Sequence, residues 1–296
     1  MRALIGFLWR CAHEPEDLNA GSVRPSTLAG LNGFLLINPR SGSGKPGTDE
    51  LRATAERCGL ETHVLAEGDD AARILRAART DALGVAGGDG SLAAGASVAI
   101  ERDLPFAVVP FGTRNHFARD VGVDRADPIA ALDAFSGREQ RVDVGRVDGR
   151  LFLNNVSFGI YAELVHRREH GRRRRAALAH ARALWLTAID RSPLRLSIDG
   201  APVEARVVLV ANNAYELDLF NVGERDSVDE GRLHLYAAAR WLPSSWEERV
   251  AERFTIDSDP PALEAGIDGE PERLEAPLEL SIEPRALRLL LPGSPG

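Results

Sequence analysis

Residues 85–91 constrain the fold of this chain more than any other segment. They read VAGGDGS, so an apolar run ends abruptly in three glycines interrupted by one acid. Glycine has no Cβ and tolerates positive φ, so successive backbone N–H groups can converge there on phosphate oxygens. Ser91 fits as the N-cap of a following helix, whose positive end would face the same space. The segment predicts a strand that ends at a phosphate-binding site.

Two other apolar segments end in loops of the same kind. Residues 33–38 (GFLLIN) lead into residues 39–45 (PRSGSGK), and residues 105–109 (PFAVV) lead into residues 110–115 (PFGTRN). One glycine cluster after a strand is commonly only a turn, whereas three such loops after three apolar strands indicate one shared site. In a parallel sheet that site lies at the carboxyl edge of the strands.

The segments between these loops complete βαβ units. Apolar stretches near residues 61–65 and 82–86 are typical of strands. Between them, Asp69 or Asp70 can cap a helix whose apolar face consists of Ala71, Ile74, Leu75 and Ala78. Alternating strands and helices predict a doubly wound parallel α/β domain, which we place at residues 31–139.

Beyond this domain the hydrophobic period changes to two. Alternating apolar residues lead into Asp148-Gly149 and Asp199-Gly200, dipeptides that are typical of hairpin turns. We therefore expect residues 140–285 to form an antiparallel β-sandwich, interrupted by one helical insertion at residues 161–190.

The two ends of the chain carry weaker signals. Residues 1–30 hold a short apolar stretch without a convincing cleavage site, so we expect a loosely ordered leader. Residues 286–296 are expected to pack back on the α/β domain.

Composition excludes several classes of function. A net charge of −8 over 296 residues argues against a nucleic-acid partner. The two cysteines, Cys11 and Cys58, supply neither a disulfide framework nor a metal-ligand set, which fits a reducing cytosol. No apolar run approaches the roughly 18 residues needed to span a bilayer. We expect a cytoplasmic protein that either is soluble or lies peripherally on a membrane.

Two common phosphate-binding motifs fit the chain poorly. The nearest candidate for a Walker A loop has Pro39 at the first glycine and Pro46 at the magnesium-binding hydroxyl. The dinucleotide-binding fingerprint matches the chain more closely, since Gly88, Gly90 and Ala93 have its spacing after a strand. That match lies on a late βα unit without the acid expected about twenty residues further on, so it stays a minor alternative.

Four motifs together resemble the diacylglycerol kinase catalytic family. In chain order they are NPRSG at 38–42, GGDGS at 87–91, PFGTRNHFA at 110–118 and DGE at 268–270. This family includes bacterial lipid kinases and sphingosine kinases, with NAD kinases and phosphofructokinases as distant relatives. The resemblance extends from about Gly33 to Pro292. It also includes two asparagine-containing turns, Asn154-Asn155 with Gly159 shortly after, and Asn212-Asn213.

The resemblance implies that ATP and Mg²⁺ bind between the two domains. Backbone amides and neutral hydroxyls would contact the phosphates while Mg²⁺ neutralises much of their charge. Asp89 cannot contact phosphate without a cation between them, so it would hold a magnesium-bound water or order its loop. The residues implied in cofactor binding are Asn38, Pro39, Arg40, Ser41, Gly42, Gly87, Gly88, Asp89, Gly90, Ser91, Gly112, Thr113 and Asn115.

Asp268 carries the catalytic prediction, together with Glu270 and Asp89. Asp268-Gly269 taken alone is most simply a hairpin turn. The resemblance instead implies that Asp268 is the general base that takes a proton from a lipid hydroxyl as this attacks the γ-phosphate, with Glu270 sharing or supporting that role.

Some positions depart from the family pattern. Ala93 and Ala94 stand where the family usually has Asn and Glu, which removes polar groups near the nucleotide. Glu230 replaces an Asp near the structural magnesium site of some bacterial relatives, so it is the candidate metal-binding residue and the ion itself is in doubt. His116 stands where many relatives have Asp.

A cluster of arginines follows in the expected helical insertion. Arg167, Arg168 and residues 172–175 precede an apolar stretch with Trp185, a pattern that suits an anionic membrane surface but is also common on solvated helix faces. Residues 166–170 (HRREH) match an inverted zinc-protease pattern, but the following arginines would disfavour a dication, so we do not expect zinc.

These observations favour an ATP- and Mg²⁺-dependent kinase that phosphorylates a lipid hydroxyl, on diacylglycerol or a sphingoid-like alcohol. The expected partners are the lipid substrate, an anionic membrane at the inner face, and a second copy in a homodimer, with no nucleic acid. Two alternatives stay open: an NAD kinase-like enzyme, and a lipid- or nucleotide-binding protein with a degraded kinase site.

Overall fold

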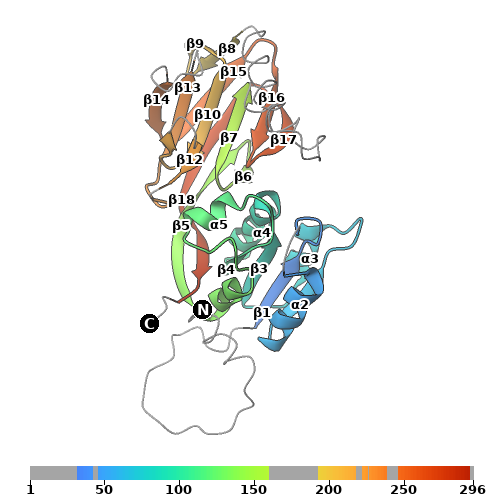
Figure 1. The fold of residues 1–296 in the computed structure, drawn as a ribbon. Coiled ribbons are helices and arrows are strands. Elements are labelled where there is room, and N and C mark those ends of the chain that lie inside the picture. Colours follow the sequence, from blue (N-terminus) through green and yellow to red (C-terminus); the bar gives the residue numbers. More distant parts are fainter. Residues whose placement is uncertain are drawn as a thin grey trace, which may run out of the picture. The chain divides into compact units, whose positions relative to one another are not determined.

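The computed structural model describes residues 32–42, 46–159, 193–217, 222–225, 227–238 and 246–293. Two compact units divide the chain at Val142/Asp143 and again at Ala286/Leu287. The first division falls within strand β5 (Arg138–Val147) and the second within strand β18 (Leu278–Leu291), so both strands contribute residues to both units (Figure 1).

Unit 1 is built on a parallel sheet. Its strands are β1 (Gly33–Ile37), β2 (Glu61–Val64), β3 (Ala82–Gly87) and β4 (Phe106–Pro110), in the order β2-β1-β3-β4, followed by the C-terminal residues of β18. Every residue of β1, β3 and β4 is buried, as in parallel strands that are covered on both faces. The predicted α/β fold with a parallel sheet is confirmed.

Helices connect these strands. They are α2 (Thr48–Arg57), α3 (Ala71–Ala77), α4 (Asp89–Glu101), α5 (His116–Asp120) and the 3₁₀-helix η1 (Ala130–Ser136). Asp70 is the N-cap of α3 and accepts a hydrogen bond from the Arg73 N–H, as one of the two predicted alternatives requires. The prediction for Ser91 is wrong, because α4 begins at Asp89 with Gly88 as its N-cap. The extended backbone of Gly88 continues directly from β3 and leaves Ser91 inside the first helical turn.

Unit 2 contains two antiparallel sheets. One has the order β14-β13-β10-β7-β16-β17, and the other contains β18, β15, β8 and β9 with the β5–β6 hairpin beside β18. Apolar residues of both sheets share one buried core, so the unit is the predicted β-sandwich. Besides β5 and β18, its strands are β6 (Arg150–Phe152), β7 (Asn155–Gly159), β8 (Leu194–Ile198), β9 (Ala201–Ala205), β10 (Val207–Asn212), β11 (Glu216–Leu217), β12 (Val222–Glu224), β13 (Leu233–Ala238), β14 (Trp246–Ala251), β15 (Arg253–Ser258), β16 (Ala262–Ile267) and β17 (Glu270–Glu275).

Asp-Gly dipeptides form three hairpin turns of this unit. Asp148-Gly149 joins β5 to β6, Asp199-Gly200 joins β8 to β9, and Asp268-Gly269 joins β16 to β17. Both residues of each pair have positive φ, from 47° to 51° for the aspartates and from 79° to 82° for the glycines. This backbone is the one that two-residue hairpins favour, so the two hairpins predicted from Asp148 and Asp199 are confirmed.

Several predictions lie outside the described residues. They concern the leader at residues 1–30, the helical insertion at residues 161–190 and the arginines within it. In the part of the chain that the structure describes, no helix has the length and hydropathy needed to cross a bilayer.

Arg288 lies in β18 and makes hydrogen bonds whose loss should destabilise unit 1. Its guanidinium donates to both carboxylate oxygens of Glu139 at 2.9 Å and to the Asp103 carbonyl at 2.8 Å. We expect Arg288→Ala to lower the free energy of unfolding by up to about 1 kcal/mol at neutral pH, measured by urea denaturation. Arg195→Ala is the control, because Arg195 is exposed and lies 3.8 Å from Glu204.

The effect of Arg288→Ala should depend on pH. The hydrogen bond from Arg288 lowers the pKa of Glu139 below its ordinary value. A carboxylate with a lowered pKa stabilises the folded state above its ordinary pKa, and that contribution is lost as the pH falls through the lowered value. The difference in the free energy of unfolding between wild type and Arg288→Ala should therefore become smaller near pH 3. If Arg288→Ala lowered the free energy of unfolding equally at pH 3 and at neutral pH, the ionised Glu139 would not be the source of the stabilisation.

Candidate functional site

Three loops gather at one edge of the unit 1 sheet. They follow β1, β3 and β4, whose carboxyl ends share that edge because the strands are parallel. Asn38 joins the first loop to the second, since its N–H donates to the Ala86 carbonyl at 2.8 Å and its Nδ2 donates to Ser91 Oγ at 2.9 Å. The Phe111 N–H joins the third loop to the second through the Gly87 carbonyl, at 3.1 Å. We call residues 38–42, 87–91 and 111–115 the loop cluster.

Glycines allow the second and third loops to touch. A Cβ added at Gly112 would lie 2.6 Å from Gly88 Cα and 2.9 Å from Asn115 Oδ1, closer than packed atoms approach. A Cβ added at Gly88 would instead meet nothing nearer than 3.9 Å. Gly112 is therefore required by packing, whereas a methyl group at Gly88 would make only ordinary van der Waals contact with Gly112 and Ser41. This arrangement fits phosphates that approach the backbone of Gly88.

Asp89 lies inside the loop cluster with only 7% of its surface exposed. Its Oδ2 accepts the His116 N–H at 3.3 Å and its Oδ1 accepts the Phe117 N–H at 3.2 Å, so the carboxylate caps the first turn of α5. Both contacts tie the second loop to the third. Of the two predicted roles for Asp89, ordering the loop is the one with contacts to support it.

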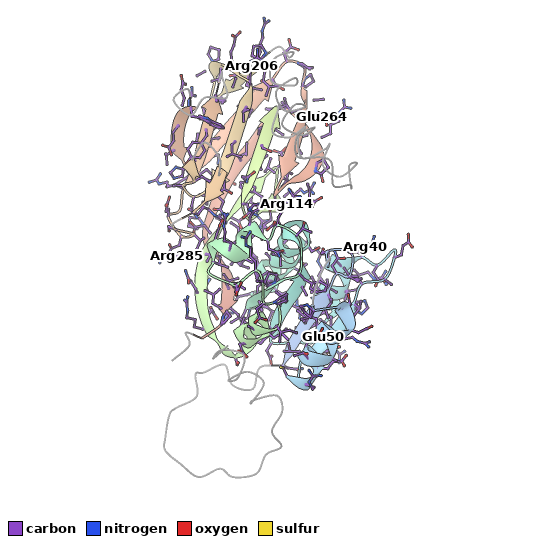
Figure 2. All side chains as sticks on the ribbon, in the orientation of Figure 1. Arg40, Glu50, Arg114, Arg206, Glu264 and Arg285 are labelled. Carbon is purple, nitrogen blue, oxygen red and sulfur yellow. The ribbon has the colours of Figure 1, made fainter. Side chains whose placement is uncertain are left out.

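Two polar residues, Asn115 and His116, lie where the third loop meets α5. Asn115 has a left-handed backbone with φ of 49°, and its amide exchanges hydrogen bonds with the backbone of Gly112 at 2.9 and 3.1 Å. Burial lowers the pKa of His116, although the nearby Asp89 carboxylate opposes that shift. The loop therefore adds a neutral imidazole rather than a cation at neutral pH. Thr113 and Arg40 are exposed at the surface of the cluster; Arg40 is labelled in Figure 2.

Asp268 belongs to unit 2 and differs from the other turn aspartates. It is 7% exposed, and its carboxylate accepts three backbone N–H groups: Leu153 at 2.8 Å, Asn154 at 2.7 Å and Asn155 at 3.1 Å. Asp148 and Asp199 stand in the same kind of turn but are exposed, and each accepts a backbone N–H at 2.8 Å. A buried and oriented carboxylate is more than a hairpin requires. Glu270 begins β17 two residues later and is partly exposed.

Residues 153–155, whose N–H groups bind Asp268, also accept hydrogen bonds from two side chains outside the predicted site, Arg225 and Asn212. We call residues 153–155 the asparagine loop. Arg225 is buried and donates through Nη1 to the carbonyl of Leu153 at 2.9 Å and through Nη2 to Asn154 Oδ1 at 3.2 Å. Asn212 Nδ2 also donates to the Leu153 carbonyl, at 3.0 Å. The family resemblance pointed to both asparagine turns, whereas no sequence pattern marks Arg225.

The carboxylates near the predicted metal position turn toward protein partners. Glu230 accepts the Ala214 N–H at 3.3 Å and lies 3.2 Å from His234 Nε2, while the other nitrogen of His234 lies 2.8 Å from Glu248. Asp229 bonds to Ser227 and lies 3.6 Å from Arg285. No group of three or more His, Cys, Asp or Glu side chains in the described ranges could hold a metal ion. Glu230 as a metal-binding residue stays a prediction, and we derive no step through a bound ion at this position.

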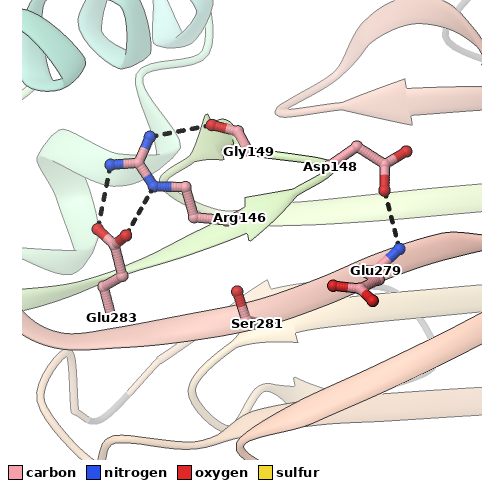
Figure 3. A pocket seen from close by; sticks show the side chains of 6 residues that line it. All are labelled: Arg146, Asp148, Gly149, Glu279, Ser281 and Glu283. Atoms are coloured by element: carbon pink, nitrogen blue, oxygen red, sulfur yellow. Dashed lines mark hydrogen bonds and ion pairs between the residues drawn. The ribbon is translucent and has the colours of Figure 1, made fainter.

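A hollow of about 480 Å³ in unit 2 contains none of the predicted site residues. Arg146 donates to both carboxylate oxygens of Glu283 at 3.0 and 3.1 Å and to the Gly149 carbonyl at 3.1 Å (Figure 3). Asp148, Glu279 and Ser281 complete its lining. These polar and charged walls are unsuited to a lipid tail.

The predicted residues thus form two groups. The loop cluster with Asp89 lies in unit 1, whereas Asp268, Glu270 and Glu230 lie in unit 2. Within unit 1, the structure brings together the three loops that the sequence predicted to share a site. Residues 43–45 of the first loop lie outside the described residues.

The loop cluster lies within the part of the chain that matches a known protein family. Residues 32–147 match the family model of the diacylglycerol kinase catalytic domain. The chain is 30% identical over 203 residues to a diacylglycerol kinase of Mycobacterium tuberculosis, covering 62% of this chain and 63% of that protein. It is 30% identical over 142 residues to a diacylglycerol kinase of Bacillus subtilis, covering 45% of this chain and 47% of that protein. The matches thus span slightly less than two thirds of the first relative and about half of the second.

The fold is also shared with a solved structure. A crystal structure of a diacylglycerol kinase from Bacillus anthracis superposes with a TM-score of 0.64 at 18% identity. That match covers 88% of this chain and 96% of the other, so the similarity in fold extends well beyond unit 1.

Proposed function

Because residues 32–147 match the diacylglycerol kinase catalytic domain, we propose that this protein is an ATP-dependent kinase that phosphorylates a lipid hydroxyl. The observation that carries the proposal is the loop cluster, which lies within the matched residues. Gly88 has no side chain, and an added Cβ would have Gly112 Cα and Ser41 Oγ as its nearest neighbours, both at 3.9 Å. A polyphosphate can approach such a backbone closely, as it could not approach a loop covered by side chains.

In the proposed reaction the loop cluster binds the phosphates of ATP. Asn38, Ser41 and Thr113 add neutral hydrogen-bonding groups to the backbone N–H groups of the second loop. Mg²⁺ would enter with ATP as part of the substrate and neutralise phosphate charge. Asp89 fixes the second loop against α5, which keeps the backbone donors in place before ATP arrives.

Asp268 is the proposed general base. The oxygen of the lipid hydroxyl forms a bond to the γ-phosphorus while the bond from that phosphorus to the β-phosphate oxygen breaks, and the hydroxyl proton passes to the Asp268 carboxylate. The products are ADP and a lipid phosphate. Three N–H donors hold the carboxylate in one orientation, which favours proton transfer in a fixed direction. Glu270 is proposed to support this role.

The acceptor and the cellular setting belong to the proposal as well. Diacylglycerol or a sphingoid-like alcohol is the expected acceptor, and an enzyme that acts on either must reach a membrane surface. The arginines at 167, 168 and 172–175 are the proposed contact with anionic lipid at the inner membrane face. A cytoplasmic location and a homodimer complete this set of predictions.

Transfer of label from γ-labelled ATP into an organic extract tests the proposed function. The assay uses the full chain, Mg²⁺, and mixed vesicles that contain either diacylglycerol or a sphingoid base. Label in one lipid product identifies the acceptor. Label transferred only to NAD, offered in a parallel reaction, would favour the NAD kinase-like alternative. ATP binding without transfer to any acceptor would favour a binding protein with a degraded site, as Ala93 and Ala94 suggest.

A further inference from the structure

Arg225 is a buried charge that the proposed reaction has not yet used. Its side chain lies in unit 2 with 6% of the residue exposed. Removing a guanidinium from water costs several kcal/mol unless its donors are satisfied. Arg225 donates through Nη1 to the carbonyls of Leu153 and Asn212, both at 2.9 Å, and lies 5.8 Å from the centre of the Tyr215 ring. These two backbone carbonyls offset part of the free-energy cost of burying the guanidinium.

One peptide group connects this guanidinium to Asp268. The carbonyl of Leu153 accepts hydrogen bonds from Arg225 Nη1 at 2.9 Å and from Asn212 Nδ2 at 3.0 Å. The N–H of the same peptide, which belongs to Asn154, donates to Asp268 Oδ1 at 2.7 Å. A cation at the carbonyl end and an anion at the N–H end polarise the peptide in the same direction, and each strengthens the hydrogen bond of the other.

We propose that Arg225 is a positioning residue for Asp268 and acts through the peptide between Leu153 and Asn154. This inference rests on the proposed function, in which Asp268 is the general base. Arg225 Nη2 also donates to Asn154 Oδ1 at 3.2 Å, so the guanidinium holds both the backbone and a side chain of the asparagine loop. A loop fixed in this way presents its N–H groups, and through them the Asp268 carboxylate, in one orientation.

The planar fork of arginine is necessary for this arrangement. Arg225 reaches three acceptors from two nitrogens, in directions that a single ammonium group cannot reproduce. Lysine retains the charge beside the Leu153 carbonyl but loses the simultaneous contacts, whereas methionine removes the charge and leaves a shorter, unbranched side chain. Arg225→Lys should therefore retain more activity than Arg225→Met.

Kinetics with these variants give the first test. We expect Arg225→Met to lower kcat by about 10- to 100-fold, since small displacements of a catalytic group have effects of this size. The KM for ATP should stay within about twofold of wild type, because the loop cluster belongs to the other unit. Arg195→Met is the matched control, since Arg195 has an exposed side chain in the same unit. A rise in the KM for ATP with kcat unchanged would overturn the proposal.

A double-mutant cycle with Asp268→Asn separates positioning from general stability. If Arg225 acts through Asp268, Arg225→Met should cause little further loss of kcat in the Asp268→Asn background. If the two losses multiply, Arg225 acts independently and the proposal fails. Activity retained by Asp268→Asn itself would instead refute the base assignment in the proposed function.

The amide proton of Asn154 gives a readout that needs no activity. Its hydrogen bond to Asp268 should place this proton well downfield in the NMR spectrum of the ¹⁵N-labelled full chain, and Arg225→Met or Arg225→Lys should move it upfield. The lysine variant serves if the methionine variant does not fold. An unchanged shift in a folded Arg225 variant would overturn the peptide connection, whether or not the protein proves to be a lipid kinase.

Discussion

Replacing Asp268 with asparagine should lower kcat for phosphate transfer by roughly 10²- to 10⁴-fold, the usual contribution of a general base. The amide has nearly the size of the carboxylate but cannot accept the hydroxyl proton. The KM for ATP should change little, because the proposed phosphate contacts lie in the loop cluster. Single-turnover transfer from γ-labelled ATP to vesicle lipid measures the chemical step directly.

The same substitution should also reduce stability. The two carboxylate oxygens of Asp268 accept three backbone N–H groups, and the NH₂ of an asparagine would face at least one of these donors. A buried donor left without an acceptor costs about 1–3 kcal/mol. Urea denaturation should therefore accompany the kinetics, with rates compared at a temperature where the variant is folded.

Asp199→Asn is the matched control for this experiment. Asp199 precedes a glycine in a hairpin of the same unit and has φ of 51°, close to the 49° of Asp268. Its side chain is exposed and accepts the Thr255 N–H at 2.8 Å. Asp199→Asn should leave kcat unchanged. Equal activity of the two variants would reduce Asp268 to a turn residue and remove it as the base.

Gly88→Ala should raise the KM for ATP at least tenfold, which is about 1.4 kcal/mol of lost binding when KM reports affinity. The added methyl group lies 3.9 Å from its nearest neighbours, Gly112 Cα and Ser41 Oγ, so the folded chain accommodates it. It would project into the space where phosphates are proposed to approach the backbone. Fluorescent-nucleotide titration measures the affinity, and thermal unfolding should show an unchanged midpoint.

Alanine substitutions at two other glycines, Gly112 and Gly47, are the controls for Gly88→Ala. Gly112→Ala places its methyl group 2.6 Å from Gly88 Cα, so it should lower the unfolding midpoint as well as nucleotide affinity. Gly47→Ala meets nothing within 4 Å at the N-cap of α2 and should leave nucleotide affinity unchanged. Wild-type affinity in Gly88→Ala would show that the phosphates of ATP do not approach Gly88.

Elements whose conformation depends on neighbouring residues could be predicted from the amino-acid sequence alone. Continuous apolar runs predicted the buried parallel strands, because a strand covered on both faces has no polar side. Asp148-Gly149 and Asp199-Gly200 predicted their hairpins, because few residues tolerate two successive positive φ values. Parallel strands share one carboxyl edge, so the association of three polar loops could also be inferred from their order along the chain.

The binding partners of the polar side chains, in contrast, depend on how distant parts of the chain pack together. Asp89 caps a helix that begins 27 residues later, and Asp268 binds N–H groups 113 to 115 residues earlier in the chain. Ser91 looked like a helix cap from its neighbours, yet the extended Gly88 occupies that position and Ser91 instead bonds to Asn38. Periodicity and turn propensity act over a few residues, whereas a carboxylate or a guanidinium is oriented by whichever donors and acceptors the packed sheets bring to it. For that reason no local sequence pattern predicted the contacts of Arg225.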